Sequence, residues 1–216
     1  MITRTHLLAG AAAIALVAAT SAAVDYQAVP ANVKMIDSSD NAQTNTLGGR
    51  NGVYKQDPSR ADFAKSIEFG KTGAGLKITF DKKGEGGLRN DGGFCGFYTV
   101  LHKGPDDYLD ATPYAYLMFW VRGDNGTEKF KVGAADKRWG ELDDSVKSQE
   151  IGNYLRSGKI TTDWQLAIIP LSEFSIDWQQ THALSFCFES DLFEGGAAQG
   201  AVFIDEVTFV QDKPHE

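Results

Sequence analysis

The side chains best suited to hold a ligand in this sequence are aromatic rings and a neighbouring cation. The candidates are Tyr98, Trp120, Arg122, Trp139 and Tyr154. Flat rings can stack on the C–H faces of sugars, and an arginine can donate paired hydrogen bonds to hydroxyl or carboxylate groups. A strand would place Trp120 and Arg122 on one face, and Trp139 lies in a charged segment, 136–141. We predict that Trp120, Arg122 and Trp139 form one outward binding face, with packing in the core as the alternative for each ring.

Strand-length apolar segments must position these residues. They recur along the chain and are separated by clusters of Gly, Asn and Asp, as in all-β folds. The predicted strands are 66–69, 75–80, 94–101, 114–122, 129–134, 165–169, 183–188 and 201–209. Helical periodicity is weak, and segment 145–155 is either a short helix or a loop.

The predicted strands alternate in hydrophobicity. Leu117, Phe119 and Val121 fall on one face of segment 114–122, opposite Trp120 and Arg122. A Leu, Phe and Val face on several strands is the inner surface of two packed sheets. The sequence therefore predicts an all-β fold, a two-sheet antiparallel β-sandwich.

The N-terminus has the pattern of a secretory signal. An apolar stretch follows Arg4, and Ser21 and Ala23 are small residues suited to cleavage after Ala23. We predict a signal peptide at 1–23 and a lead-in at 24–34, with an anchored or disordered tail as the alternative. The apolar stretch is too short to span a bilayer, and no later segment approaches the roughly 20 apolar residues that are required. We therefore expect export to the periplasm or the exterior.

The composition of the chain limits the classes of molecule that it is expected to bind. The chain has 216 residues and a net charge of −8, which disfavours nucleic acid and anionic membranes but suits neutral glycans. The length after the signal peptide fits one domain, 35–212, with a tail at 213–216.

Cys95 and Cys187 are an even pair in an exported chain, so we predict a disulfide between them, with two separate buried thiols as the alternative.

Four motifs occur in a recognisable order. They are Ile36-Asp37-Ser38-Ser39-Asp40 with Asn45-Thr46-Leu47-Gly48-Gly49, then Tyr114 to Gly123, then Ile160 to Phe174, and finally Ile204-Asp205-Glu206-Val207-Thr208-Phe209. This order resembles that of β-jelly-roll carbohydrate-binding modules, especially family 11, and is also similar to that of complex I intermediate-associated proteins. The resemblance covers about Asp37 to Phe209 and implies a jelly-roll, galactose-binding-like fold.

The resemblance also implies a structural Ca²⁺ held by Asp37 in the opening strand and Asp205 in the closing strand. Calcium takes six to eight oxygen ligands, and these two carboxylates could supply some of them. Asp205 lies within an apolar strand, where a carboxylate is costly unless it meets a cation or several hydrogen-bond donors. We therefore predict that Asp205 either binds Ca²⁺ or accepts several hydrogen bonds.

Catalytic motifs are sparse. The histidines lack zinc-like spacing, and the acidic pairs at 106–107 and 143–144 fall in predicted turns. No nucleophile elbow, phosphate loop or dinucleotide fingerprint is present. We therefore predict an exported, non-catalytic carbohydrate-binding module whose partner is a glycan. Two alternatives remain: a polysaccharide lyase or hydrolase, and a periplasmic or extracellular assembly protein that uses the sandwich for contacts with a protein partner.

Overall fold

The structure is a computed structural model that describes residues 32–86, 92–194 and 196–213. The predicted signal peptide, 1–23, most of the predicted lead-in and the last three residues of the tail lie outside the described residues. Within the described part of the chain, no helix is long and apolar enough to cross a membrane.

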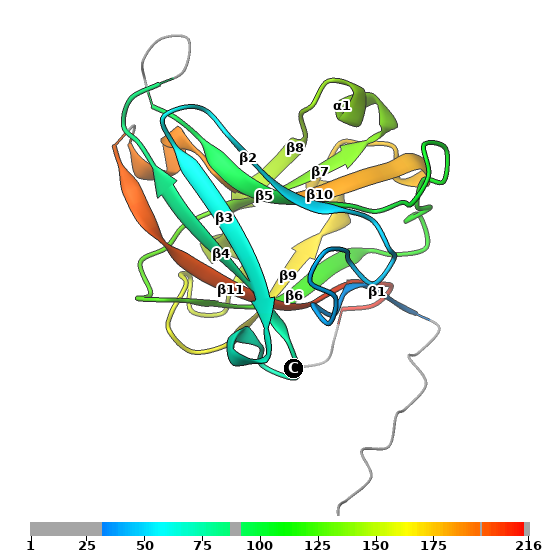
Figure 1. Cartoon of the computed structure of the whole chain (residues 1–216). Coiled ribbons are helices and arrows are strands. Elements are labelled where there is room, and N and C mark those ends of the chain that lie inside the picture. Colours follow the sequence, from blue (N-terminus) through cyan, green and yellow to red (C-terminus); the bar gives the residue numbers. More distant parts are fainter. Residues whose placement is uncertain (1–31, 87–91, 195, 214–216) are drawn as a thin grey trace, which may run out of the picture.

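Two antiparallel sheets pack face to face (Figure 1). The six-stranded sheet has the order β3 (Arg60–Ser66), β4 (Gly75–Lys82), β11 (Ala198–Val210), β6 (Tyr116–Gly123), β9 (Gln165–Pro170), and β1 (Val33–Asp37) also pairs with β11. The five-stranded sheet has the order β2 (Asn51–Lys55), β5 (Cys95–Val100), β10 (Thr181–Phe188), β7 (Lys131–Asp136), β8 (Val146–Glu150). The predicted two-sheet sandwich is confirmed.

Short helical segments connect some of these strands. The α-helix α1 (Lys137–Glu141) follows β7. The 3-10 segments are η1 (Ile67–Phe69), η2 (Ile151–Tyr154), η3 (Leu171–Glu173), η4 (Trp178–Gln180) and η5 (Ser190–Phe193). Two predictions therefore need correction, because 66–69 is mostly η1 rather than a strand, and 145–155 contains β8 and η2.

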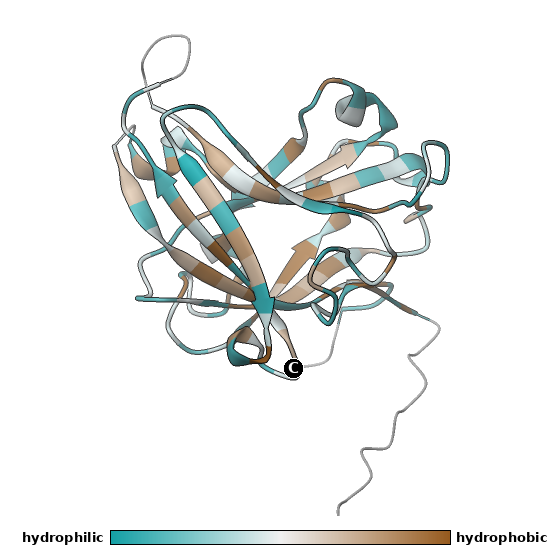
Figure 2. Ribbon diagram, viewed as in Figure 1, coloured by the Kyte–Doolittle hydropathy of each residue, from teal (hydrophilic) through white to brown (hydrophobic). Residues whose placement is uncertain are grey.

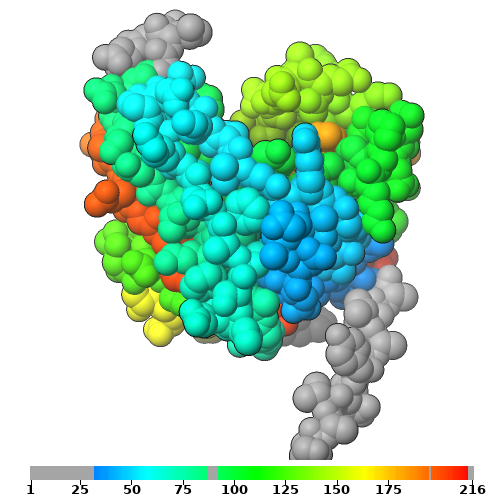
Figure 3. All heavy atoms as spheres, viewed as in Figure 1, coloured from blue at the N-terminus to red at the C-terminus, as the bar shows by residue number. Residues whose placement is uncertain are grey.

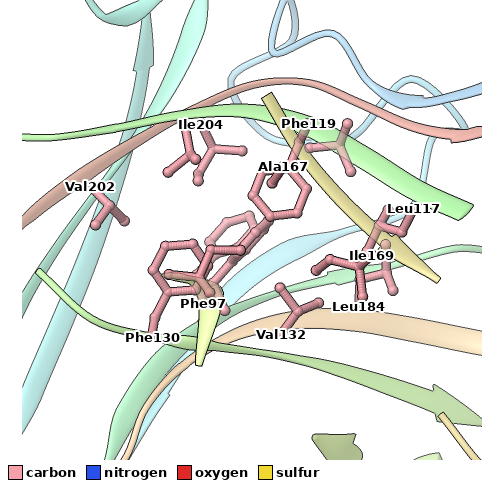
Figure 4. Close-up of a cluster of buried hydrophobic side chains, with 14 of the residues drawn as sticks. Phe97, Leu117, Phe119, Phe130, Val132, Ala167, Ile169, Leu184, Val202 and Ile204 are labelled. Carbon is pink, nitrogen blue, oxygen red and sulfur yellow. The ribbon is translucent and has the colours of Figure 1, made fainter. Parts of the chain in front are cut away.

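The predicted alternation builds the core. In β6, Leu117, Phe119 and Val121 are fully buried while their neighbours are half-exposed. Figure 4 shows Leu117 and Phe119 facing side chains of the other sheet, such as Leu184. In Figure 2, apolar brown and polar teal positions alternate along several strands, as expected for strands with one buried face.

Strand β11 changes partner along its length. Its first half pairs with β4 and its second half with β1, and its ladder with β6 shifts register just after Asp205. Glu206 has a φ of 52°, in the left-handed region, so the strand contains a bulge at this point. Beyond the bulge, Val33 of β1 pairs with Val210, so the start of the first strand lies beside the end of the last strand.

Candidate functional site

A groove lies over the outer face of the five-stranded sheet, on the side away from the core. Its volume is about 680 Å³, and in Figure 3 it is the hollow at the top of the molecule, beside the yellow-green atoms of α1 and β8. Its floor contains small side chains of β7 and β10, namely Ala135, Ala183 and Ser185. Leu184 and Phe186 alternate with the β10 floor residues and point into the core. Small outward side chains therefore give the groove its depth.

One wall of the groove is aromatic. Tyr54 of β2, Tyr98 of β5 and Phe94 line it. In the β2–β5 ladder, Tyr54 lies opposite Gly96 and Tyr98 lies opposite Gly52. A β-carbon would come within 2.5 Å of the Tyr54 ring at Gly96 and within 2.6 Å of the Tyr98 ring at Gly52. Each glycine therefore gives the tyrosine of the neighbouring strand room to lie across the backbone.

The Tyr54 hydroxyl is a hydrogen-bonding group rather than a base. Burial raises the pKa of Tyr54 well above its ordinary value, and the adjacent Cys187 thiol adds to the increase. The phenol therefore stays protonated across the physiological range.

The opposite wall begins at α1. The buried Asp136 carboxylate accepts a hydrogen bond from the Trp139 backbone N–H at 3.0 Å and another from the Asp177 N–H at 2.9 Å. The first contact caps the helix, and the second ties it to the segment before β10. Segment 142–145 then forms the wall, with the Leu142 side chain 61% exposed. An exposed leucine facing an aromatic wall offers a second apolar contact to a ligand.

Charged groups border the groove. Lys147 Nζ lies 2.8 Å from an Asp144 oxygen and 3.8 Å from a Glu189 oxygen. Arg50 lies near Tyr98, with Cζ 5.8 Å from the ring centroid, and makes no ion pair with a described residue. The border therefore offers donors and acceptors for a polar ligand.

A turn before β2 positions Arg50. The buried Asn45 amide donates hydrogen bonds to Thr99 Oγ1 and to the Val100 carbonyl, both at 2.7 Å, and its oxygen accepts one from the Gly49 N–H at 2.9 Å. This cross-link fastens the turn to β5 and places Arg50 at the groove.

The predicted ligand-binding residues do not come together. Tyr98 lines the groove, and Trp139 lies in α1, next to the groove residue Gly140. Trp120 and Arg122 lie on the outer face of the six-stranded sheet, so the predicted single face of Trp120, Arg122 and Trp139 is wrong. Tyr154 packs against the core and accepts a hydrogen bond from the Gln149 N–H at 3.1 Å. Alternation shows which side chains point outward but not which sheet carries them.

Side chains of the protein itself cover the Trp120 region. Lys71 Nζ lies 4.0 Å from the centroid of the Trp120 ring. Arg122 Cζ lies 3.7 Å from the centroid of the Phe203 ring, and Phe203 is only 5% exposed. Each cation therefore already lies against one face of its ring and competes there with any ligand.

The aromatic wall had a signal in the sequence. Gly52-Val53-Tyr54 and Gly96-Phe97-Tyr98 repeat a glycine two residues before a tyrosine. In an antiparallel pair, this repeat allows each tyrosine to lie over the glycine of the other strand. Arg50, Phe94 and the residues of segment 142–145 carry no comparable pattern.

The carboxylates predicted to bind calcium are already satisfied. Lys65 Nζ lies 2.8 and 3.0 Å from the two Asp37 oxygens, and both side chains are buried. Burial raises the pKa of Asp37, while the Lys65 ammonium opposes that shift. Asp205 accepts hydrogen bonds from the N–H groups of Lys71 at 2.8 Å, Thr72 at 3.0 Å and Glu206 at 2.8 Å.

These two donor sets do not fit Ca²⁺. An ammonium stands where the cation would have to bind at Asp37, and no group of three or more acidic, His or Cys side chains suitable for a metal occurs among the described residues. The hydrogen-bonding prediction for Asp205 is confirmed, because its carboxylate joins the loop before β4 to the β11 bulge.

Cys95 and Cys187 are free buried thiols, and the predicted disulfide is wrong. On the neighbouring strands β5 and β10, Cys95 lies opposite Phe188 while Cys187 lies opposite Gly96. This one-residue offset places the two side chains on opposite faces of the sheet. Cys95 belongs to the core, and Cys187 lies 3.3 Å from the Ser185 hydroxyl under the groove. Burial raises the pKa of Cys95 to about 11.

A sandwich with a groove over one sheet is the architecture of a jelly-roll carbohydrate-binding module, and comparisons with known proteins agree. The family described as carbohydrate binding domain 30 matches residues 35–211. The chain therefore belongs to this family and is a carbohydrate-binding module. No curated protein is significantly similar to this sequence.

Solved structures show the same fold. A family 11 carbohydrate-binding module from Clostridium thermocellum, in complex with a β-1,3-1,4-mixed-linked tetrasaccharide, has a TM-score of 0.60 at 14% identity, covering 85% of this chain and 98% of that chain. The family 30 module of the cellulosomal cellulase Cel9D-Cel44B from the same organism has a TM-score of 0.55 at 18% identity, covering 80% and 96%. A β-1,2-glucanase from Parabacteroides distasonis matches at 14% identity with a TM-score of 0.56, covering 84% of this chain but 25% of the enzyme.

Proposed function

We propose that this module binds a neutral β-linked glucan chain in the groove over the five-stranded sheet. The observation that carries the proposal is the aromatic wall of Tyr54, Tyr98 and Phe94 above a floor of small side chains. Aromatic rings stack on the apolar faces of β-linked glucose units, and the polar groups along the border meet the hydroxyls.

Two further observations favour a neutral glucan. The similar family 11 module binds a β-1,3-1,4-mixed-linked tetrasaccharide. The groove border also carries the carboxylates Asp143, Asp144 and Glu189, whose oxygens can accept hydrogen bonds from the hydroxyls of a neutral sugar.

Calorimetric titration with the mixed-linked tetrasaccharide tests the proposal. Tyr98→Ala should weaken binding about tenfold, which corresponds to ~1–2 kcal/mol for one stacking ring. Trp120→Ala, on the other sheet, is the matched control and should bind like the wild type. Loss of binding in Trp120→Ala with retained binding in Tyr98→Ala would place the site on the opposite face.

Reducing-sugar release measured on the same samples tests the alternative of a polysaccharide-active enzyme.

We also propose that the module acts outside the cytoplasm. Residues 1–23 have the pattern of a signal peptide, and a module of this class meets its polysaccharide after export. Mass spectrometry of protein recovered from the periplasm or medium should find a chain that begins near Val24. Recovery of a chain that still carries residues 1–23 would contradict cleavage at this point.

A further inference from the structure

Two histidines form a hydrogen-bonded pair beside the groove. His182 of β10 lines the groove, and His102 follows β5. His102 Nε2 lies 2.8 Å from His182 Nδ1, and His102 Nδ1 lies within hydrogen-bond distance of the Gly104 carbonyl oxygen. Because a carbonyl only accepts, neutral His102 must carry its proton on Nδ1. Its Nε2 is then an acceptor, so His182 donates through Nδ1.

This chain of hydrogen bonds also determines whether the other nitrogen of His182, Nε2, is a donor or an acceptor. With its proton on Nδ1, neutral His182 carries a lone pair on Nε2. This Nε2 makes no hydrogen bond within the described part of the chain and is not a buried unpaired atom there, so it is open to the groove. A β-carbon on Gly140 would lie 2.5 Å from His182 Cδ2 and 2.9 Å from Nε2, so a glycine is needed at this position for α1 to pack against the imidazole ring.

We infer that His182 binds the glycan by accepting a hydrogen bond from a sugar hydroxyl through Nε2, and that His102 is the positioning residue that makes this nitrogen an acceptor. The inference rests on the proposed function and deepens it. A proton taken up by the pair turns Nε2 into a donor and places a charge beneath the bound sugar. Covering that charge with a ligand costs desolvation, so the affinity for a neutral glycan falls on acidification.

The charges around the pair keep it neutral near pH 7. Burial lowers the pKa of His182, and the neighbouring His102 and Arg50 oppose a positive charge there as well, whereas Asp143 raises this pKa. A second proton on the pair is opposed further, because both nitrogens of the shared hydrogen bond would then be donors.

Two groups on other elements complete this environment. The Tyr108 ring centroid lies 4.8 Å from that of His102, and Lys137 Nζ lies 5.7 Å from the Tyr108 ring centroid. Lys137 adds positive charge on this side. The carboxylate of Asp136, at the end of β7, is already engaged by two backbone N–H groups.

The first test needs no ligand. Imidazole ¹⁵N–¹H correlation spectra of the unliganded full chain at pH 7.5 should show both histidines as Nδ1–H tautomers. An Nε2–H tautomer at His182 would overturn the inference, whatever the protein binds.

The second test is the pH profile of binding to the mixed-linked tetrasaccharide. Wild-type affinity should fall by about three- to tenfold on acidification from pH 7.5 as the pair takes up a proton, because a charge that the ligand must desolvate replaces the acceptor at Nε2. His102→Leu removes the acceptor that holds His182 Nδ1–H, so its affinity at pH 7.5 should fall by a similar factor. His102→Gln offers a carbonyl acceptor in its place and should restore the affinity at pH 7.5.

These outcomes separate the two proposals. Binding that is unchanged on acidification, or His102→Leu binding like the wild type, would overturn the histidine inference alone. Absence of wild-type binding at every pH would contradict the proposed function and this inference with it.

Discussion

The outer faces of the two sheets both carry aromatic side chains, but the two sets of rings have different neighbours. On the five-stranded sheet, Tyr54 and Tyr98 lie over glycines and border an open groove. On the six-stranded sheet, Lys71 lies over the Trp120 ring and Arg122 lies over the Phe203 ring. The first face carries a groove, whereas on the second face cationic side chains of the same protein lie against the rings.

The neighbouring residue therefore decides what an outward aromatic ring can do. A glycine across the ladder lets a ring lie along the sheet with one face open, whereas a long cation beside it occupies that face. A ring that is covered by such a cation contributes to the free energy of unfolding. A ring with an open face is instead available to contribute to the free energy of ligand binding.

The largest expected effect is a loss of stability on the six-stranded sheet. Phe203→Ala should lower the free energy of unfolding by about 3–5 kcal/mol, because the ring is almost fully buried beneath Arg122. Phe94→Ala is the matched control, since Phe94 is 40% exposed in the groove wall and should lose much less. Urea denaturation measures both, and equal losses would contradict the contrast between the faces.

The Asp205 contact on the six-stranded sheet should give the next largest effect. Asp205→Ala leaves the N–H groups of Lys71 and Thr72 without their acceptor, at a cost of about 1–3 kcal/mol per group that stays buried. A chelator should leave the melting temperature of the wild type unchanged. A clear drop in melting temperature with the chelator would instead reveal a structural metal ion.

On the five-stranded sheet, Gly52→Ala should weaken glucan binding without unfolding the domain. Its β-carbon would displace the Tyr98 ring, and losing one stacking ring reduces affinity about tenfold. Trp120→Ala, on the other sheet, is the control and should keep wild-type affinity. Wild-type affinity in Gly52→Ala would mean that the position of Tyr98 does not govern binding.

The smallest expected effect is a pH dependence of stability that originates at the groove. The pKa of His182 is lower in the folded protein than its ordinary value of about 6.5, so the unfolded chain binds more protons below that pH. The free energy of unfolding should therefore fall as the pH drops through this window. His182→Asn should lose less stability between pH 7.5 and 5.5 than the wild type, and an identical loss would rule out His182 as the source.

The central strands were predictable because burial dominates their composition. Strands β5, β6, β10 and β11 carry the apolar alternation that the sequence displays. Strands β2, β3 and β8 were not predicted, and each lies at the edge of its sheet. An edge strand buries less of its surface and tolerates lysine and other polar residues, so its periodicity is weak.

Predicting the candidate site would have required predicting these same edge strands. Tyr54 lies on β2, and Lys147 lies on β8, so missing the edge strands meant missing both flanks of the groove. Tyr98 was recovered because it lies on a strongly apolar strand. The Cys95–Cys187 prediction failed because an even cysteine count carries no information about the faces on which the thiols lie.

The pairing of Val33 with Val210 determines how the domain responds to force. The chain enters β1 and leaves β11 at the same end of this antiparallel pair, which belongs to the sheet that does not carry the groove. A load applied through both ends opens this pair one hydrogen bond at a time, because the bonds lie perpendicular to the strands and break in sequence. The domain is therefore mechanically soft when stretched between its ends and gives way first at β1. A load between a glycan in the groove and either end instead passes through both packed sheets.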